Sequence, residues 1–299
     1  MTTSLNRPLK ALCLASAVAV LASCGGATST VDPFQPSRVI GLGDAYNVID
    51  GSIYSVRQTG TIESVVGQVA ASFGVSNLVS QASNTATISA LSTQISNIGT
   101  FTSSDLVVLS AGTQDIIDAY QTSDPVATAE AKADLLVNQV KEVLARGATH
   151  VLILPPLEVS VTPYAVASRA TNPTVTPVIP LNYDSSPTVK FNTRVSGALQ
   201  TYIASQGYSK NPVIISGLSL SSTFNAYATG ALTGYFANGT TPWCPITSVV
   251  NDSTNTQGCV PNSTTGDGNY LFADLIHLTP YGNRWVASYM YNSTAQGWR

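Results

Sequence analysis

The stretch RVIGLGDAYNVID, residues 38–50, decides the fold, because it joins a short apolar run to a glycine–aspartate turn. A near-continuous run of valine, isoleucine and leucine is typical of a strand covered on both faces of a parallel sheet. Three later runs have the same character: residues 105–112, 150–156 and 212–217. We therefore expect a parallel sheet whose first strand ends at Gly43, with Asp44 and Ala45 just beyond its carboxyl end.

Helical patterns lie between these runs. The segments with apolar residues at helical spacing are 61–74, 126–146, 188–206 and the stretch that begins at Pro280. This alternation predicts a single α/β domain, a three-layer α/β/α sandwich with a parallel central sheet. The stretches 157–187 and 218–270 are rich in Pro, Thr, Tyr and Gly, so we expect irregular loops there, over the top of the sheet.

The composition excludes one class of partner. Charged residues make up 10% of the 299 residues and the net charge is −3, without a basic block. Soluble chains typically carry roughly 25% charged residues, so serine, threonine and asparagine do most of the solubilising here. Nucleic acid is therefore not an expected partner.

The first 24 residues have the pattern of an export signal. Arg7 and Lys10 precede the apolar stretch ALCLASAVAVL (11–21), which is too short to span a bilayer comfortably. The tetrapeptide LASC at its end closes on Cys24 and resembles the bacterial lipobox, in which the cysteine is lipidated and becomes the mature N-terminus. The alternative is a plain secretory signal with a chance cysteine.

These features divide the chain into a signal peptide (1–23), a lipidated Cys24 with a flexible tether (24–37) and a domain (38–299). A lipid on Cys24 would anchor the protein to a membrane without a transmembrane helix. Gly25 follows, and not the aspartate that retains many such proteins at the inner membrane. The resemblance therefore favours the outer membrane of a bacterial cell envelope.

Two cysteines remain in the predicted mature domain, Cys244 and Cys259. Exported proteins fold in an oxidising compartment, so we expect a disulfide between them. A metal site is not expected, because the two thiols have no nearby histidine partners.

Three polar stretches follow predicted strands or lie near the C-terminus. They are GLGDA after the first strand, SAGTQDI (110–116) after a central strand, and FADLIHLTPYG (272–282). In open α/β sheets, binding sites form beyond the carboxyl ends of the strands. We therefore expect these three stretches to meet at one site.

Together the three stretches resemble the SGNH/GDSL hydrolases, a family of esterases, lipases and acyl hydrolases. That family has Gly-Asp-Ser after its first strand, Gly-x-Asn-Asp after a central strand, and Asp-x-x-His followed by Leu-Thr-Pro near its end. The resemblance covers about residues 38–295, and DLIHLTPYG is its most specific part. It implies a flavodoxin-like sandwich and ester hydrolysis without a cofactor.

The resemblance also implies roles for individual residues. His277 would be the general base and Asp274 would orient its imidazole. The position of Ala45 would hold the nucleophile on the turn formed by Gly43 and Asp44. The oxyanion and substrate-binding positions would be Ala45, Gly112 and Gln114. The second histidine, His150, begins a predicted strand and is expected to be structural.

The chain departs from the family pattern at three places. Ala45 replaces the nucleophilic serine, so no acyl-enzyme can form there. Gln114 replaces the asparagine, and its longer side chain would misplace the amide donor. A further oxyanion glycine should fall within residues 76–87, which contain no glycine. A single engineered substitution would not produce all three changes, so we favour natural divergence.

These departures favour an exported lipoprotein with lost or strongly impaired ester hydrolysis and a retained cleft for an acyl-ester, lipid or glycan ligand. The first alternative is an active carboxylic-ester hydrolase that uses a relocated nucleophile, such as Ser52 or Ser55, or a water activated by His277. The second is a structural envelope lipoprotein. Aromatic residues in the irregular stretches are candidates to line the cleft: Tyr164, Tyr183, Tyr227, Tyr235, Phe236 and Trp243.

Overall fold

The computed structural model describes residues 33–50, 63–171, 173, 175–181, 184–216, 218–244 and 270–298. The chain divides into the units Met1–Phe34 and Gln35–Arg299, and every helix and strand described below belongs to the second unit. None of the described helices is both long and apolar enough to cross a membrane.

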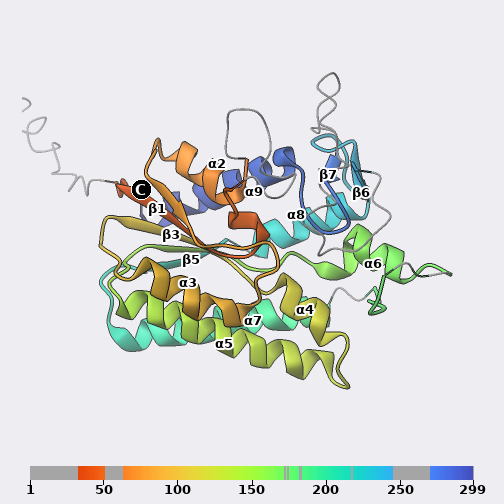
Figure 1. Ribbon diagram of the computed structural model, residues 1–299, viewed down its shortest axis with the longest axis horizontal. Coiled ribbons are helices and arrows are strands. Elements are labelled where there is room, and N and C mark those ends of the chain that lie inside the picture. The colour runs from red at the N-terminus through yellow and green to blue at the C-terminus, as the bar shows by residue number, and fades with distance from the viewer. Residues whose placement is uncertain are drawn as a thin grey trace, which may run out of the picture. The chain divides into compact units, whose positions relative to one another are not determined.

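A parallel five-stranded sheet forms the centre of the fold (Figure 1). Its strands are β1 (Arg38–Gly43), β2 (Leu78–Ser80), β3 (Asp105–Ser110), β4 (Val151–Leu154) and β5 (Val213–Ile215). Their spatial order is β2-β1-β3-β4-β5, and every neighbouring pair is parallel. The four strands expected from the apolar runs are all present, and the α/β sandwich with a parallel central sheet is confirmed.

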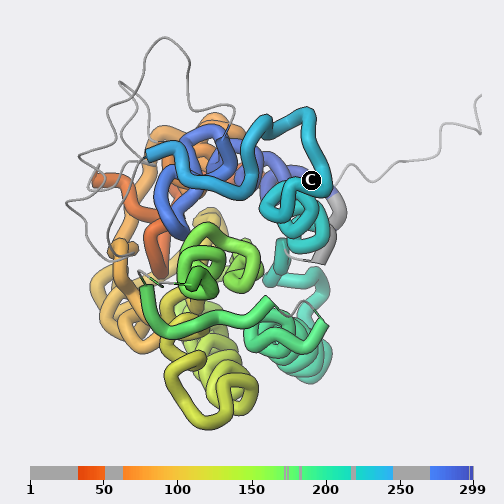
Figure 2. The backbone as a smooth tube through the Cα atoms, turned by 90° about the vertical axis from the view of Figure 1, so that its right-hand side faces the viewer, coloured from red at the N-terminus to blue at the C-terminus, as the bar shows by residue number. Residues whose placement is uncertain are grey.

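Helices cover both faces of this sheet. The helices are α2 (Val65–Ser72), α3 (Leu91–Ile98), α4 (Thr113–Ala119), α5 (Pro125–Ala145), α6 (Pro163–Ser168), α7 (Pro187–Gln206), α8 (Leu218–Ala228) and α9 (Pro280–Ser293). Helices α2 and α9 pack together on one face, and α3, α5 and α7 lie on the other (Figure 1). Figure 2 shows the same layers in a view turned by 90°.

Several helices begin with the same local device, a capping residue followed by proline. Ser186 accepts a hydrogen bond from the backbone N–H of Val189, and Pro187 occupies the first turn of α7. Thr279 and Pro280 begin α9 in the same way. Proline fits this position because its missing N–H would have had no partner inside the helix. The device explains why these helices begin where the sequence pattern placed them.

The expectation of irregular loops was wrong for part of residues 218–270. Helix α8 lies there, followed by β6 (Asn238–Pro242), which pairs in parallel with β7 (Tyr270–Phe272). The serine and threonine content of α8 led to the prediction of a loop. Its apolar residues nevertheless form a buried stripe at helical spacing: Leu220, Phe224, Tyr227 and Ala228. Helix α6 likewise interrupts the predicted loop 157–187.

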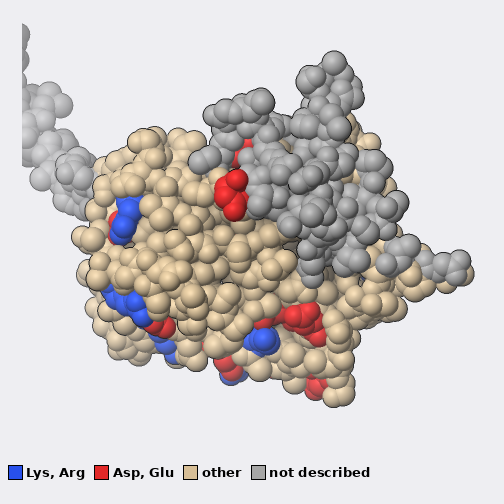
Figure 3. Space-filling view, viewed as in Figure 1, with Lys and Arg blue, Asp and Glu red and all other residues tan. Residues whose placement is uncertain are grey.

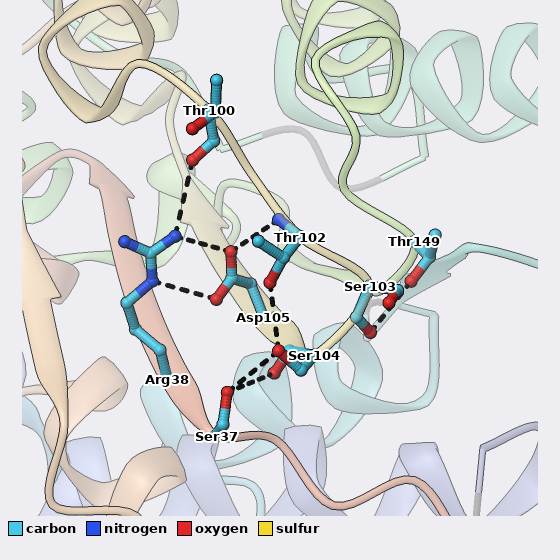
Figure 4. Close-up of polar contacts among 8 residues, drawn as sticks. All are labelled: Ser37, Arg38, Thr100, Thr102, Ser103, Ser104, Asp105 and Thr149. Carbon is cyan, nitrogen blue, oxygen red and sulfur yellow. Dashed lines mark hydrogen bonds and ion pairs between the residues drawn. The ribbon is translucent and has the colours of Figure 1, made fainter.

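A bidentate ion pair joins the amino ends of the two central strands β1 and β3 (Figure 4). Arg38 donates from Nε and Nη2 to the two carboxylate oxygens of Asp105, at 2.9 and 2.6 Å. The backbone N–H of Thr102 also donates to this carboxylate, at 2.8 Å. The pKa of Asp105 is held below its usual value: burial would raise it, but these hydrogen bonds and the Arg38 charge outweigh burial. The pair fixes the register of β1 against β3 at the amino ends of these strands, at the opposite end of the sheet from the candidate site.

Candidate active site

The turn after β1 requires glycine at position 43. Gly43 has φ of +108°, and a Cβ built there would lie 1.6 Å from the carbonyl oxygen of Ser110 on β3. The side-chain amide of Gln94 in α3 forms hydrogen bonds with both backbone groups of this glycine. It accepts from the Gly43 N–H at 2.6 Å and donates to the Gly43 carbonyl oxygen at 3.0 Å. The end of β1 is therefore pressed against β3 and held from α3.

Asp44 is buried and ties the turn to β3. Its backbone N–H donates to Ser110 O at 2.8 Å, and the Ser110 hydroxyl donates to its Oδ1 at 2.7 Å. It also caps the short 3-10 turn Ala45–Asn47, accepting from Tyr46 N–H. Burial raises the pKa of Asp44 to about 6, although these hydrogen bonds and the nearby His277 oppose the shift. Asp44 thus supports the turn and adds negative charge beside the site.

Ala45 begins that 3-10 turn and is only 5% exposed. Its side chain is a methyl group, which offers neither a lone pair nor a proton. Its backbone N–H has no hydrogen-bond partner among the described residues. The position therefore keeps a backbone donor but has no nucleophile.

Asp274 and His277 form a closed pair in the connection between β7 and α9. Nδ1 of His277 lies 2.6 Å from Oδ2 of Asp274. The other carboxylate oxygen accepts from the backbone N–H groups of Ile276 and His277, at 2.8 and 2.6 Å. An ionised carboxylate can only accept, so Nδ1 carries the proton and a neutral imidazole keeps its Nε2 lone pair.

The electrostatics of the pair agree with this arrangement. Burial would lower the pKa of His277, but the charge and hydrogen bond of Asp274, with a smaller contribution from Asp44, raise it above the usual value. Burial would raise the pKa of Asp274, but His277 and two backbone N–H groups lower it. An imidazole held this way can accept a proton from a group in front of it.

A small pocket, partly open to solvent, brings most of the predicted site residues together. The pocket is lined from four segments: Asp44 and Ala45 on the turn after β1, Asn84 between β2 and α3, Thr113 and Gln114 in α4, and His277 between β7 and α9. Ile117 and Ile276 supply apolar walls. Gly112 and Asp274 adjoin the pocket through Thr113 and His277 but do not line it.

Gly112 and Gln114 begin α4 at the edge of this pocket. Gly112 caps the helix with φ of +119°, and a Cβ there would come within 2.8 Å of Pro156. The side-chain amide of Gln114 donates to Asp118 one turn along α4, at 2.8 Å. In this arrangement the amide is bound along the helix, so its predicted role as an oxyanion donor requires a change of side-chain conformation.

Sequence reasoning missed three residues with polar groups that line the pocket, Tyr46, Asn84 and Thr113. Asn84 lies in the stretch 76–87, where the missing family glycine was expected, and its Oδ1 is buried without a hydrogen-bond partner among the described residues. The one feature of the sequence that could have drawn attention to Asn84 is that residues 76–87 lack the glycine expected from the family pattern. Thr113 lines the same pocket as His277.

None of the predicted cleft aromatics that the structure describes lines this pocket. Tyr227 and Phe236 pack edge to face at 5.0 Å, and Tyr235 stacks on Tyr281 at 4.8 Å. Trp243 packs against Tyr270, and Tyr164 donates to Thr176 O. These rings therefore serve packing, because α8 and β6 occupy the region expected to be open loop. Tyr183 lies outside the described residues.

The remaining predicted residues lie elsewhere. His150 packs edge to face on Trp298 with ring centroids 5.0 Å apart, and burial lowers its pKa to about 4, in agreement with a structural role. Cys244 is buried. The cysteines Cys24 and Cys259 and the serines Ser52 and Ser55 lie outside the described residues. Within the described ranges, no group of three or more His, Cys, Asp or Glu residues could hold a metal ion.

The chain matches the family model of the GDSL-like lipases/acylhydrolases over residues 39–290, which include the turn at Ala45 and the Asp274–His277 pair. The chain therefore belongs to this family of esterase- and lipase-like hydrolases, as the three sequence stretches indicated.

Solved structures with a similar fold include an acetyl xylan esterase, at 14% identity and TM-score 0.47, covering 86% of this chain and 98% of that one. Others are a lipase/acylhydrolase from Enterococcus faecalis (13%, TM-score 0.45, covering 87% and 96%) and phospholipase A1 from Streptomyces albidoflavus NA297 (18%, TM-score 0.41, covering 75% and 95%). No curated protein matches the chain significantly.

Proposed function

We propose that this chain is an exported lipoprotein of the GDSL-like family that has lost, or nearly lost, ester hydrolysis and keeps a ligand-binding pocket. One observation carries the proposal: the paired imidazole of His277 lines the same pocket as Ala45, whose methyl group stands on the turn after β1. Alanine has no oxygen to attack a carbonyl carbon, so covalent catalysis cannot proceed from this turn.

The other departures support a further loss of rate. The amide of Gln114 is bound to Asp118, and Asn84 lines the pocket within the stretch that lacks the expected glycine. Loss of one oxyanion donor typically costs about 10²–10³ in rate. Attack by a water that His277 activates would lack the same oxyanion donors, so hydrolysis by that route would be slow.

Ligand binding needs only a shaped pocket with a few polar groups. Ile117 and Ile276 offer apolar walls. Asn84, Thr113 and the backbone N–H of Ala45, which has no partner among the described residues, can form hydrogen bonds. These groups suit the carbonyl and hydroxyl oxygens of an acyl ester, a lipid or a glycan.

The lipid anchor, the signal peptide and the disulfide are proposed from sequence alone. Mass spectrometry of the mature protein should show a first residue Cys24 with a mass increase matching acyl chains, and a Cys24→Ser variant should lack it. A chain that begins elsewhere, or an unmodified cysteine, would contradict the anchor. Peptide mapping without reduction tests the Cys244–Cys259 bond.

Esterase activity tests the proposed loss of hydrolysis. With p-nitrophenyl butyrate, we expect the wild type to stay at background and Ala45→Ser to raise the rate by about 10²-fold, since the oxyanion donors are incomplete. Adding His277→Ala to Ala45→Ser should remove that gain. Turnover by the wild type that disappears in His277→Ala would show instead a working hydrolase.

A second candidate function has its own observation in the pocket. The Asp274–His277 pair is intact and Thr113, a residue with a hydroxyl, lines the same pocket, so a hydrolase with a relocated nucleophile is the second candidate. A fluorophosphonate probe followed by peptide mapping decides it: labelling of Thr113, Ser52 or Ser55 that depends on His277 supports an active hydrolase. The absence of both rescue by Ala45→Ser and ligand binding would favour a structural lipoprotein.

A further inference from the structure

The end of β6 holds the turn that carries the paired imidazole of the candidate site. Strand β6 pairs with β7, and Figure 1 shows the two strands side by side. The pairing continues past the end of β6, where the backbone N–H of Trp243 donates to Phe272 O at 2.8 Å. The backbone N–H of Cys244 then donates to Ala273 O at 2.9 Å. Because Asp274 follows Ala273, this last hydrogen bond lies directly before the site.

Ala273 connects the end of β6 to the Asp274–His277 pair. Its carbonyl oxygen accepts from Cys244, and its own N–H donates to His277 O at 2.8 Å, which closes the turn around the pair. Cys244 and Ala273 also pack together in a small buried cluster, and each is 1% exposed. A displacement of Cys244 would therefore move the residue whose backbone closes this turn.

In the part of the chain that the structure describes, one other distant segment binds the backbone of this turn. The N–H of Tyr164 in α6 donates to Leu275 O at 2.8 Å. That hydrogen bond holds the middle of the turn and leaves Ala273 dependent on Cys244. The turn thus has two anchors outside its own sequence, and Cys244 is the one beside Asp274.

The charges that act on His277 come from inside the fold. Burial lowers the pKa of His277, whereas the charge and hydrogen bond of Asp274, and the charge of Asp44 on the turn after β1, raise it. On the described part of the surface in Figure 3, acidic and basic side chains are few and scattered. The distance between His277 and Asp274 therefore has the most direct effect on the pKa of the imidazole, and a looser turn would lower it.

We propose that Cys244 is a positioning residue whose disulfide keeps Asp274 and His277 paired, so that the redox state of this bond controls the site. The inference rests on the Cys244–Cys259 bond expected from the sequence, and it requires neither a lipid on Cys24 nor the loss of hydrolysis. A dithiol reductant would supply two electrons and two protons: the S–S bond breaks, two thiols form, and the reductant becomes a cyclic disulfide. The end of β6 then loses its covalent restraint, and its hold on Ala273 weakens.

NMR titration of the full chain tests this link, because both histidines report in one spectrum. After reduction with dithiothreitol, we expect the pKa of His277 to fall toward its ordinary value of about 6.5. The pKa of His150, which packs on Trp298 at the amino end of β4, should stay unchanged and serves as the internal control. Cys259→Ser keeps the Cys244 side chain but removes the bond. This variant should titrate like the reduced wild type and should not respond to dithiothreitol.

Turnover in the Ala45→Ser background gives a second readout. There, Cys259→Ser should lower kcat for p-nitrophenyl butyrate by about 10–10²-fold with little change in KM, because the base is misplaced. An unchanged His277 titration after reduction, or equal shifts of both histidines, would overturn the inference. Free thiols at both cysteines in the untreated chain would overturn it as well. The NMR titration needs no turnover, so failure of Ala45→Ser to hydrolyse esters is distinguishable from failure here.

Discussion

Gly43 is the residue on which the geometry of the pocket depends, because any side chain there would meet the Ser110 carbonyl at 1.6 Å. We expect Gly43→Ala to lower the free energy of unfolding by about 3 kcal/mol or more, through the clash and the positive φ together. Urea denaturation measures it.

Gly197 in α7 is the matched control, since a Cβ there meets nothing within 4 Å. Gly197→Ala should raise stability by about 0.5–1 kcal/mol. If both substitutions have the same small effect, the turn after β1 is not as tightly held as described.

Ionisation of the buried Asp44 carboxyl destabilises the fold, and the pH dependence of stability tests the sign of this effect. Its pKa of about 6 in the fold lies above the value of about 3.9 expected when unfolded, so the fold favours the protonated carboxyl. That stabilisation is present below about pH 4 and is lost as the pH rises through 6. At pH 8, Asp44→Asn should therefore be more stable than the wild type by about 2 kcal/mol, because asparagine can still accept from Ser110.

The difference between Asp44→Asn and the wild type should shrink as the pH falls toward 4. Urea titrations at several pH values measure it, with a variant at the exposed Asp118, Asp118→Asn, measured alongside. An asparagine variant that is less stable at pH 8 would show that the ionised carboxylate is needed in the turn.

The two histidines should titrate on opposite sides of the ordinary value of about 6.5. The pKa of His277 is raised and that of His150 is lowered to about 4. NMR of the imidazole protons resolves both, and Asp274→Asn should lower only the His277 pKa. Protonated His277 stabilises the fold below about pH 6.5, and this contribution is lost as the pH rises through its folded pKa. Two overlapping titrations would contradict the pairing.

At the scale of elements, the clamp between β1 and β3 should outweigh an exposed ion pair of the same chemistry. We expect Asp105→Asn to cost about 1–3 kcal/mol at pH 7, because its side chain is only 2% exposed and accepts from both Arg38 and Thr102. Its lowered pKa means that the contribution is present above about pH 4 and is lost as the pH falls through the folded value.

Asp134 forms a similar two-bonded pair with Arg194, but both side chains are about half exposed. Solvent screens such pairs, so Asp134→Asn should change the unfolding midpoint little. Equal losses in Asp105→Asn and Asp134→Asn would show that burial does not decide the strength of these clamps.

The sequence predicted the elements whose pattern is independent of distant contacts. The strands β1, β3 and β4 are long apolar runs, and α5, α7 and α9 combine apolar stripes with capping residues and proline. Strand β2 and helices α3 and α4 were not predicted. Strand β2 has three half-buried residues, and it forms because β1 supplies its hydrogen-bond partners. Short elements of this kind depend on tertiary contacts more than on their own residues.

The candidate site was predictable only where a motif marks it. Asp274 and His277 lie three residues apart, so local sequence was enough to pair them. Asn84 lies in the connection between β2 and α3, Thr113 begins α4, and no spacing in the sequence relates either of them to Ala45. The side-chain amide of Gln114 donates a hydrogen bond to Asp118, a residue that is not part of the family pattern. Side-chain partners of this kind emerge only when the fold brings their elements together.

At the scale of the whole molecule, Trp298 packs against the segments that precede β4 and β5, at the amino ends of these strands. Trp298 is 4% exposed, donates from Nε1 to Asn211 O at 2.9 Å before β5, and packs on His150 before β4. We expect Trp298→Ala to cost about 3 kcal/mol, measured by urea denaturation. Tyr208→Ala, at an exposed aromatic residue three positions before Asn211, should cost much less. Equal costs would show that the C-terminus does not hold the two strands.

The scarcity of charge at the end of the fold that contains residues 159–181 and 218–244, in which Arg169 is the single charged residue, has a kinetic consequence. Charged clefts draw oppositely charged ligands from a distance, and their association rates fall as salt rises. A neutral approach surface exerts no such pull, so capture of a ligand through this end should proceed at a rate that barely responds to ionic strength. Encounters there would be governed by diffusion and by how long each collision lasts.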